Sequence, residues 1–120
     1  MISRIHHTAW VALLAAMLCA PALAAQGADR QSIARGHAFV LEHCSLCHAV
    51  ERTGVSSYAP APPFRTLHER YDVEGLAEAF AEGIVVPHAG PRQMPQFMLS
   101  PAEIDDLISY LKSLEPRKRR

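Results

Sequence analysis

The sequence predicts a small all-α domain, because it contains three amphipathic helical patterns, two long proline-containing loops and no alternating strand pattern. Its 120 residues suffice for one domain, and no internal repeat or second domain is visible. Hydrophobic residues make up 49% of the chain, which argues against a disordered protein. The formal net charge of zero disfavours nucleic acid as a partner, because nucleic-acid-binding domains usually carry a basic stripe.

The first 24 residues predict an export signal rather than a part of the fold. A weakly basic start with Arg4 precedes an apolar run from Ala9 to about Ala20, which Pro21 ends. Small residues follow, so we expect cleavage after Ala24 or Ala25 and a mature protein in the periplasm. The apolar run is shorter than the ~20 residues that span a bilayer. An uncleaved membrane anchor is the alternative.

The first predicted helix begins near Asp29, a residue type that favours the N-cap position. Ile33, His37, Val40 and Cys44 follow at spacings of four, three and four, so they share one helical face. This face leads directly into the first of two closely spaced cysteines.

The middle predicted helix has Asp72 as its expected N-cap. Leu76, Phe80 and Ile84 recur every four residues, and Gly83 stands where a C-terminal glycine is expected.

The last predicted helix has the clearest start signal. Ser100, Pro101 and Glu103 supply an N-cap, a first-turn proline and the partner of a capping box. An apolar stripe follows, formed by Ile104, Leu107, Ile108, Leu111 and Leu114.

Two long loops join these helices. The first runs from about Ala49 to Asp72, with a helical turn expected around Phe64–Glu69, and the second runs from about Val85 to Leu99. Loops of this length are unusual in a compact domain. They are expected where something other than protein fills the centre. The prolines that interrupt them are Pro60, Pro62, Pro63, Pro87, Pro91 and Pro95.

The segment Cys44–His48 reads C-x-x-C-H, the signature of c-type haem attachment. On a helical turn, positions i and i+3 place both sulfurs on one face, where each can bond a haem vinyl group. Position i+4 lies close to that face, so the imidazole of His48 can reach the iron. We therefore expect one haem c, bound covalently through Cys44 and Cys47, with His48 as an iron ligand.

Three other interpretations of the two cysteines remain. A redox-active dithiol of the thioredoxin type needs a βαβ context, which the sequence lacks. A structural zinc site needs two further ligands at suitable spacing. A plain disulfide between Cys44 and Cys47 would be strained by its short loop. Cys19 leaves with the export signal, and the large Leu18 before it does not match a lipid-attachment site.

Met94 is the preferred candidate for the second iron ligand. It lies in the second long loop, and the rigid Pro95 beside it helps to hold a loop sulfur in place. A thioether ligand raises the reduction potential and closes the iron to substrates. Met98 and His88 are the alternatives, and Met98 is more naturally a packing residue. Surface or hydrogen-bonded positions are expected for His37, His43 and His68, with His43 facing away from the haem.

These residues resemble the class I cytochrome c family, in its small bacterial exported branch. The resemblance extends from Asp29 to Leu114, within a domain expected at 29–115. The C-x-x-C-H motif is its specific part. The other elements are matched by order and spacing: Gly36 and Phe39, Ala61-Pro62-Pro63-Phe64, Met94-Pro95-Gln96-Phe97, and the last helix with Tyr110.

The resemblance implies a crossing of the first and last helices, with Gly36 at the contact and Phe39 and Tyr110 packed beside it. It also implies that a backbone carbonyl of Pro62 or Pro63 accepts the imidazole proton of His48, which would orient the ring. The sequence does not choose between these two prolines.

The expected function is single-electron transfer, with the iron cycling between Fe(II) and Fe(III) and no site open for catalysis. The protein would therefore be a carrier rather than an enzyme, with an exposed haem edge near Cys44 and Cys47. The alternatives are a five-coordinate haem protein that binds gas or reduces peroxide, and a fixed subunit of a dehydrogenase or oxidase complex. The expected apolar pocket comprises Leu46, Phe64, Leu67, Leu76, Phe80 and Phe97.

The expected partners are redox proteins that the sequence does not identify. We expect a monomer. Residues 116–120 form a basic tail that is either a frayed end or a docking element for an acidic partner or an anionic membrane surface.

Overall fold

The computed structural model describes residue 26 and residues 29–83 and 92–116. The chain divides into two units, Met1–Arg30 and Gln31–Arg120, and the second contains nearly all of the described residues. The predicted export signal, Ile84, His88 and residues 117–120 lie outside the described part. All regular structure in that part is helical, which confirms the all-α prediction. None of the helices described there is long and apolar enough to cross a membrane.

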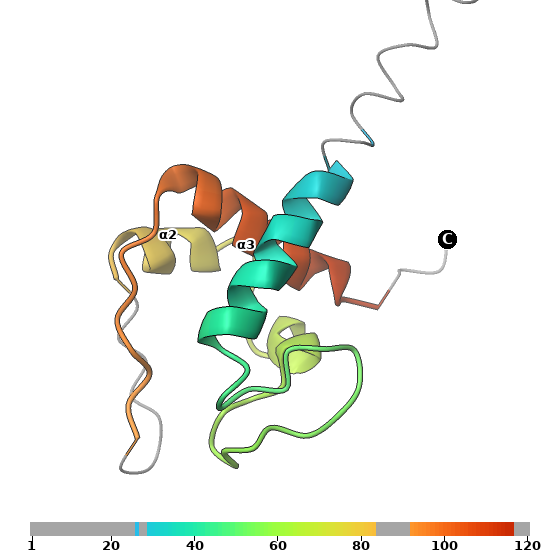
Figure 1. Ribbon diagram of the computed structural model, residues 1–120, viewed down its shortest axis with the longest axis vertical. Helices are drawn as coiled ribbons and strands as arrows, with labels where there is room; N and C mark the ends of the chain where they lie inside the picture. The colour runs from blue at the N-terminus through green and yellow to red at the C-terminus, as the bar shows by residue number, and fades with distance from the viewer. Residues whose placement is uncertain (1–25, 27–28, 84–91, 117–120) are drawn as a thin grey trace, which may run out of the picture. The chain divides into compact units, whose positions relative to one another are not determined.

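Four helical segments make up the regular structure (Figure 1). The N-terminal helix covers residues 29–43. A 3-10 helix, η1, follows at Phe64–Glu69, where the sequence predicted a helical turn. The α-helices α2 and α3 cover Leu76–Ala81 and Pro101–Ser113. Residues 49–63 and 92–99, which belong to the two predicted loops, lie outside the helices.

The start of α3 is fixed by the predicted capping box. The Ser100 hydroxyl accepts a hydrogen bond from the Glu103 backbone amide, and the Glu103 carboxylate accepts one from the Ser100 amide at 2.8 Å. Pro101 occupies the first turn, where its missing N–H leaves no partner unsatisfied. The stripe is buried largely as predicted, although Ile108 is only half-buried and Tyr110 is buried instead.

The N-terminal helix crosses α3 at Gly36. A Cβ atom at Gly36 would lie 2.0 Å from the backbone oxygen of Asp106 and 2.9 Å from Cβ of Tyr110, so only glycine permits this approach. Beside the contact, the Arg35 guanidinium donates two hydrogen bonds to the Asp106 carboxylate, at 2.6 and 2.8 Å. These bonds lower the pKa of Asp106. The crossing implied by the resemblance is therefore present, with Tyr110 at the contact.

The start of α2 differs from the prediction. Gly75 is its N-cap rather than Asp72, and the helix begins at Leu76. The Asp72 carboxylate instead accepts a hydrogen bond from the Glu74 amide at 3.2 Å, so it stabilises the turn that precedes the helix. At the other end, Gly83 has a φ of 79°, the left-handed conformation predicted for a terminal glycine. The helix packs against α3, and Lys112 pairs with Glu74 beside it.

One hydrophobic core holds the helices together. The N-terminal helix contributes Val40 and Cys44, and α3 contributes most of its buried stripe. Phe64 of η1 and two loop valines complete the core, and the half-buried Phe39 packs against it. The buried members are Val40, Cys44, Val50, Phe64, Val73, Leu107, Tyr110, Leu111 and Leu114.

Candidate functional site

The C-x-x-C-H motif forms a turn that continues from the end of the N-terminal helix. The Cys44 amide donates to the Val40 carbonyl at 2.9 Å, which is a helical hydrogen bond. The amides of Cys47 and His48 then both donate to the Cys44 carbonyl, at 3.1 and 3.0 Å. These bonds bring Cys44, Cys47 and His48 to the same cavity.

The two cysteines are free thiols, so the plain disulfide is absent from the structure. Cys44 is 8% exposed, and its burial, with the adjacent Cys47 as a smaller cause, raises its pKa to about 11. Redox-active dithiols rely on a lowered pKa, because the thiolate is the reactive species. The environment of Cys44 therefore does not resemble that of a thioredoxin-type site.

His48 is oriented by a backbone carbonyl. Its Nδ1 lies 2.8 Å from the carbonyl oxygen of Pro62, and its ring contacts Phe64 with centroids 4.9 Å apart. The Pro63 carbonyl is used differently, because it accepts hydrogen bonds from the amide and hydroxyl of Thr66 in η1. The question that the sequence left open is thus answered in favour of Pro62.

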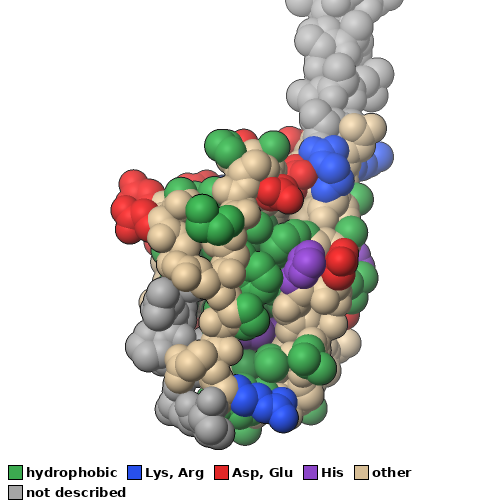
Figure 2. Space-filling view, turned by 60° about the vertical axis from the view of Figure 1, so that its left-hand side comes forward, with side chains coloured by type: hydrophobic (Ala, Val, Ile, Leu, Met, Phe, Trp, Pro, Cys, Tyr) green, Lys and Arg blue, Asp and Glu red, His purple; other side chains and the backbone are tan. Residues whose placement is uncertain are grey.

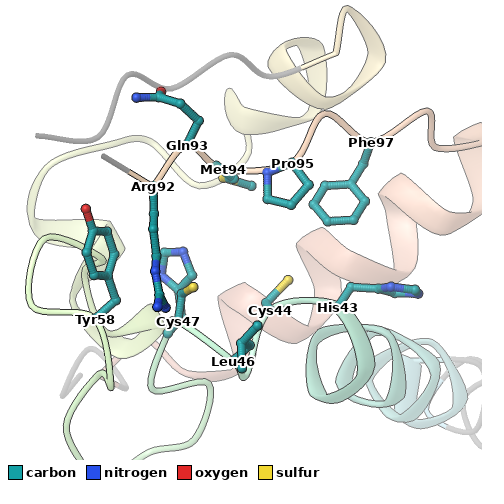
Figure 3. A pocket seen from close by; sticks show the side chains of 11 residues that line it. His43, Cys44, Leu46, Cys47, Tyr58, Arg92, Gln93, Met94, Pro95 and Phe97 are labelled. Carbon is teal, nitrogen blue, oxygen red and sulfur yellow. The ribbon is translucent and has the colours of Figure 1, made fainter. Parts of the chain in front are cut away.

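The facing wall of the cavity is formed by residues 92–97, which we call the Met94 segment. Figure 3 shows Met94 and Pro95 on one side of the cavity and Cys44 and Cys47 on the other. Met94 is half-buried and lines the cavity. Met98 is 89% exposed and does not line it, whereas His88 lies outside the described residues. Of these two methionines, Met94 therefore lies at the cavity and Met98 does not.

The cavity has a volume of about 80 Å³ and is partly open to solvent. Most of its lining is apolar, with Arg92 and Tyr58 at one end and Phe97 and His43 at the other (Figure 3). The lining residues are His43, Cys44, Leu46, Cys47, His48, Tyr58, Arg92, Gln93, Met94, Pro95 and Phe97.

The predicted apolar pocket is only partly correct. Leu46 and Phe97 line the cavity, but Phe64, Leu67, Leu76 and Phe80 belong to the hydrophobic core or pack against it. Phe64 is a buried member of the core, and Leu67, Leu76 and Phe80 are partly buried against it. Leu46 itself is 79% exposed, which leaves the surface beside Cys44 and Cys47 open to solvent.

The other predicted histidines have three different environments. His37 hydrogen-bonds with the Glu51 carboxylate at 2.6 Å. The ring of His43 contacts Phe39 and Phe97, and although Figure 3 shows it directed away from Cys44, His43 is one of the residues that line the cavity. His68 is half-buried, and its Nδ1 is buried without a hydrogen-bond partner among the described residues. It lies one 3-10 turn after Arg65, whose Nη1 is buried in the same way.

Sequence reasoning missed Tyr58 and Arg92 as cavity residues. Arg92 could have been predicted as a cavity residue, because it stands two positions before the candidate ligand Met94. Tyr58 carried no such signal, because its place depends on the path of the loop after His48. Its amide donates to the Cys47 carbonyl at 3.3 Å, and this bond folds the loop back onto the cysteine motif.

The donors around the cavity fit a covalently bound haem. Two thiols stand on one side, an imidazole held through Nδ1 adjoins them, and a thioether lies on the facing wall. A carbonyl only accepts hydrogen bonds, so Nδ1 of His48 carries the proton and Nε2 carries the lone pair that a metal needs. Within the described residues, no group of three or more histidine, cysteine or acidic side chains is placed to hold a metal ion. A zinc site of the usual kind is therefore not formed there.

Comparison with known proteins gives the same family as the motif. The family profile named cytochrome c matches residues 33–115 of the chain. Cytochrome c-552 of Bradyrhizobium diazoefficiens is 33% identical over 73 residues, which cover 61% of this chain and 65% of that protein. The match thus spans less than two thirds of that relative. No solved structure matches the chain. On the extent of the profile match, the chain belongs to the cytochrome c family, whose members carry covalent haem c and transfer electrons.

Proposed function

We propose that this chain is a monohaem periplasmic electron carrier, with haem c attached through Cys44 and Cys47 and its iron bound by His48 and Met94. The observation that carries the proposal is the meeting of these four side chains at one cavity. They come from two walls that lie far apart in the sequence, so their meeting is not a trivial result of the motif spacing.

The ligand residues support electron transfer rather than substrate chemistry. Haem iron, when bound, supplies the Fe(II)/Fe(III) couple. The Pro62 carbonyl holds the His48 ring in one orientation and one tautomer, which leaves Nε2 to bind the iron. Met94 on the facing wall would be the second residue to hold the iron, and its thioether would exclude water and small ligands.

The apolar lining supports the same role. Phe97, Pro95 and Leu46 surround the cavity with side chains that cannot stabilise charge. Such surroundings disfavour the additional positive charge of ferric iron and favour the reduced state. The exposed Leu46 between the two cysteines marks the edge at which electrons would enter and leave.

Periplasmic location rests on the export-signal pattern of residues 1–24 and on the attachment motif. Fractionation of cells that express the full chain tests it. The haem-bearing product should be released with the periplasmic contents, at a mass lacking the first 24 or 25 residues. Haem protein retained in the membrane fraction at full mass would contradict cleavage and support an uncleaved anchor.

Expression of the full chain together with a haem-attachment system tests the function. A haem-stained denaturing gel should show covalent haem, and the reduced-minus-oxidised spectrum should be that of a low-spin c-type cytochrome. Met94→Ala should abolish the low-spin spectrum and lower the reduction potential, whereas Met98→Ala, the matched control, should leave both unchanged. A Met94→Ala spectrum identical to that of the wild type would refute the Met94 assignment.

The same preparation separates the two rival functions. A wild-type protein that binds carbon monoxide or cyanide readily would indicate a five-coordinate haem. Purification at native abundance as part of a larger complex would indicate a fixed subunit. A monomeric protein of low-spin spectrum supports the free carrier.

A further inference from the structure

Arg92 and Tyr58 form a contact that joins the two walls of the cavity. The guanidinium carbon of Arg92 lies 5.9 Å from the centroid of the Tyr58 ring. This distance is within the ~6 Å at which a cation is attracted to an aromatic face. Figure 3 shows both side chains at the same end of the cavity, with Arg92 reaching from the Met94 segment toward the opposite wall.

Tyr58 is itself fixed to the cysteine motif. Its amide donates to the Cys47 carbonyl at 3.3 Å, and the hydroxyl of the preceding residue, Ser57, donates to the Leu46 carbonyl. Its own carbonyl accepts a hydrogen bond from the Ala61 amide at 2.9 Å, one residue before Pro62. A side chain bound to Tyr58 is thus connected to the wall that carries both cysteines and His48.

Arg92 is the first described residue of the Met94 segment and stands two residues before Met94. The other end of this segment is held by α3 and by the contacts of Phe97 with Phe39 and His43, whose ring centroids are 5.9 and 5.8 Å away. No hydrogen bond or ion pair to a carboxylate is seen for Arg92 within the described residues. Its ring contact is therefore the described interaction that ties this end to the other wall.

We propose that the Arg92–Tyr58 contact is a clasp that holds the Met94 segment over the cavity, which makes Arg92 a positioning residue for Met94. The proposal rests on the proposed function, because it needs Met94 to be an iron ligand. It predicts that breaking the clasp makes Met94 easier to displace from the iron, without changing the covalent attachment at the cysteines.

Displacement of Met94 by added imidazole in the ferric protein measures this directly. Exposed cation–π contacts contribute ~0.5–1 kcal/mol, so Arg92→Gln and Tyr58→Leu should each increase the apparent imidazole affinity about two- to five-fold. Tyr58→Phe retains the aromatic face and should stay close to the wild type. The double variant should add little to either single change, because both remove the same contact.

Arg70→Gln is the matched control, because Arg70 is an exposed arginine at the end of η1 and does not line the cavity. It should leave the imidazole affinity unchanged. Circular dichroism checks that each variant keeps its helices. Should Arg92→Gln not fold, the comparison of Tyr58→Phe with Tyr58→Leu makes the same test on the other partner.

The failure of the clasp and the failure of the proposed function give different results. A wild type that shows the charge-transfer band of methionine-bound ferric haem, with unchanged imidazole affinity in Arg92→Gln and Tyr58→Leu, overturns the clasp alone. A wild type without that band overturns the Met94 assignment and the clasp with it. Equal increases in imidazole affinity in Tyr58→Phe and Tyr58→Leu would show that the hydroxyl group of Tyr58, rather than its ring, makes the contact. That result would also overturn the clasp.

Discussion

Nδ1 of His48 lies 2.8 Å from the carbonyl oxygen of Pro62, and the two residues are 14 positions apart in the chain. Because a carbonyl oxygen can only accept, this bond fixes the proton on Nδ1 and the lone pair on Nε2. Bonds of this kind orient the ring of a metal-binding histidine and raise its basicity. A loop residue thus determines the chemistry of a side chain that belongs to the attachment motif.

The His48 bond predicts a protected ring proton. In the ferrous holoprotein with ¹⁵N-labelled histidine, the Nδ1–H of His48 should give a slowly exchanging signal in NMR spectra, because the ring is half-buried and the proton is hydrogen-bonded. His43, whose side chain is 38% exposed, should exchange with water too fast to be seen. Rapid exchange at both histidines would contradict the Pro62 bond.

Gly36 predicts a large steric effect at the helix crossing. In Gly36→Ala, the new Cβ would meet the Asp106 backbone oxygen at 2.0 Å, and neither helix backbone can move without loosening the core. Overpacking costs ~1–3 kcal/mol, which outweighs the ~1 kcal/mol that alanine gains over glycine in helix propensity. We expect a lower free energy of unfolding, measured by urea titration of the holoprotein.

A reverse substitution in the same helix separates the two effects. Ala38 is exposed, so Ala38→Gly should show only the propensity cost of ~1 kcal/mol. Gly36→Ala should lower the free energy of unfolding, although alanine has a higher helix propensity than glycine. A Gly36→Ala protein that is as stable as the wild type would mean that the helices do not approach this closely.

Tyr110 predicts a stability change in alkaline solution. Its hydroxyl donates to the Val50 carbonyl at 2.8 Å, and burial, with the nearby Glu51 as a smaller cause, raises its pKa from 10.0 to about 12. The folded state therefore favours the neutral hydroxyl. Its stabilising contribution should be complete below pH 10 and should be lost as the pH rises toward about 12.

Tyr110→Phe should lack this part of the pH dependence and should be less stable at neutral pH by ~1–3 kcal/mol, because the Val50 carbonyl loses a buried donor. Urea titrations of both proteins over a series of pH values measure the two effects. Their difference in stability should shrink between pH 10 and about 12. A constant difference over that range would assign the alkaline loss to another group.

The elements that could be predicted from the sequence are those set by local spacing. The capping box at Ser100 and Glu103, the terminal Gly83 and the turn Cys44–His48 each depend on residues a few positions apart, and each forms as expected. The crossing at Gly36 was predicted from the family resemblance, because the sequence of the first helix alone does not indicate which helix packs against it.

Features that depend on the path of a loop could not be predicted. Pro62 and Pro63 have equivalent carbonyls in the sequence. Only the fold shows that the Pro62 carbonyl accepts a hydrogen bond from His48 and the Pro63 carbonyl accepts one from Thr66. Tyr58 reaches the cavity because the loop after His48 folds back onto Cys47. The burial of Phe64 in the core rather than in the cavity likewise follows from the orientation of η1, which spacing does not fix.

The separate contributions of Cys44 and Cys47 can be tested by serine substitutions. In the proposed site each sulfur forms its own bond to the cofactor, so Cys44→Ser or Cys47→Ser should keep one covalent bond and still stain for haem on a denaturing gel. The double variant should lose all stain, although His48 and Met94 remain. Because Cys44 is 8% exposed and lies in the core, whereas Cys47 is half-buried, Cys44→Ser should also lower the thermal stability more than Cys47→Ser. Haem that stays bound to the double variant under denaturing conditions would show that a third residue is the attachment point.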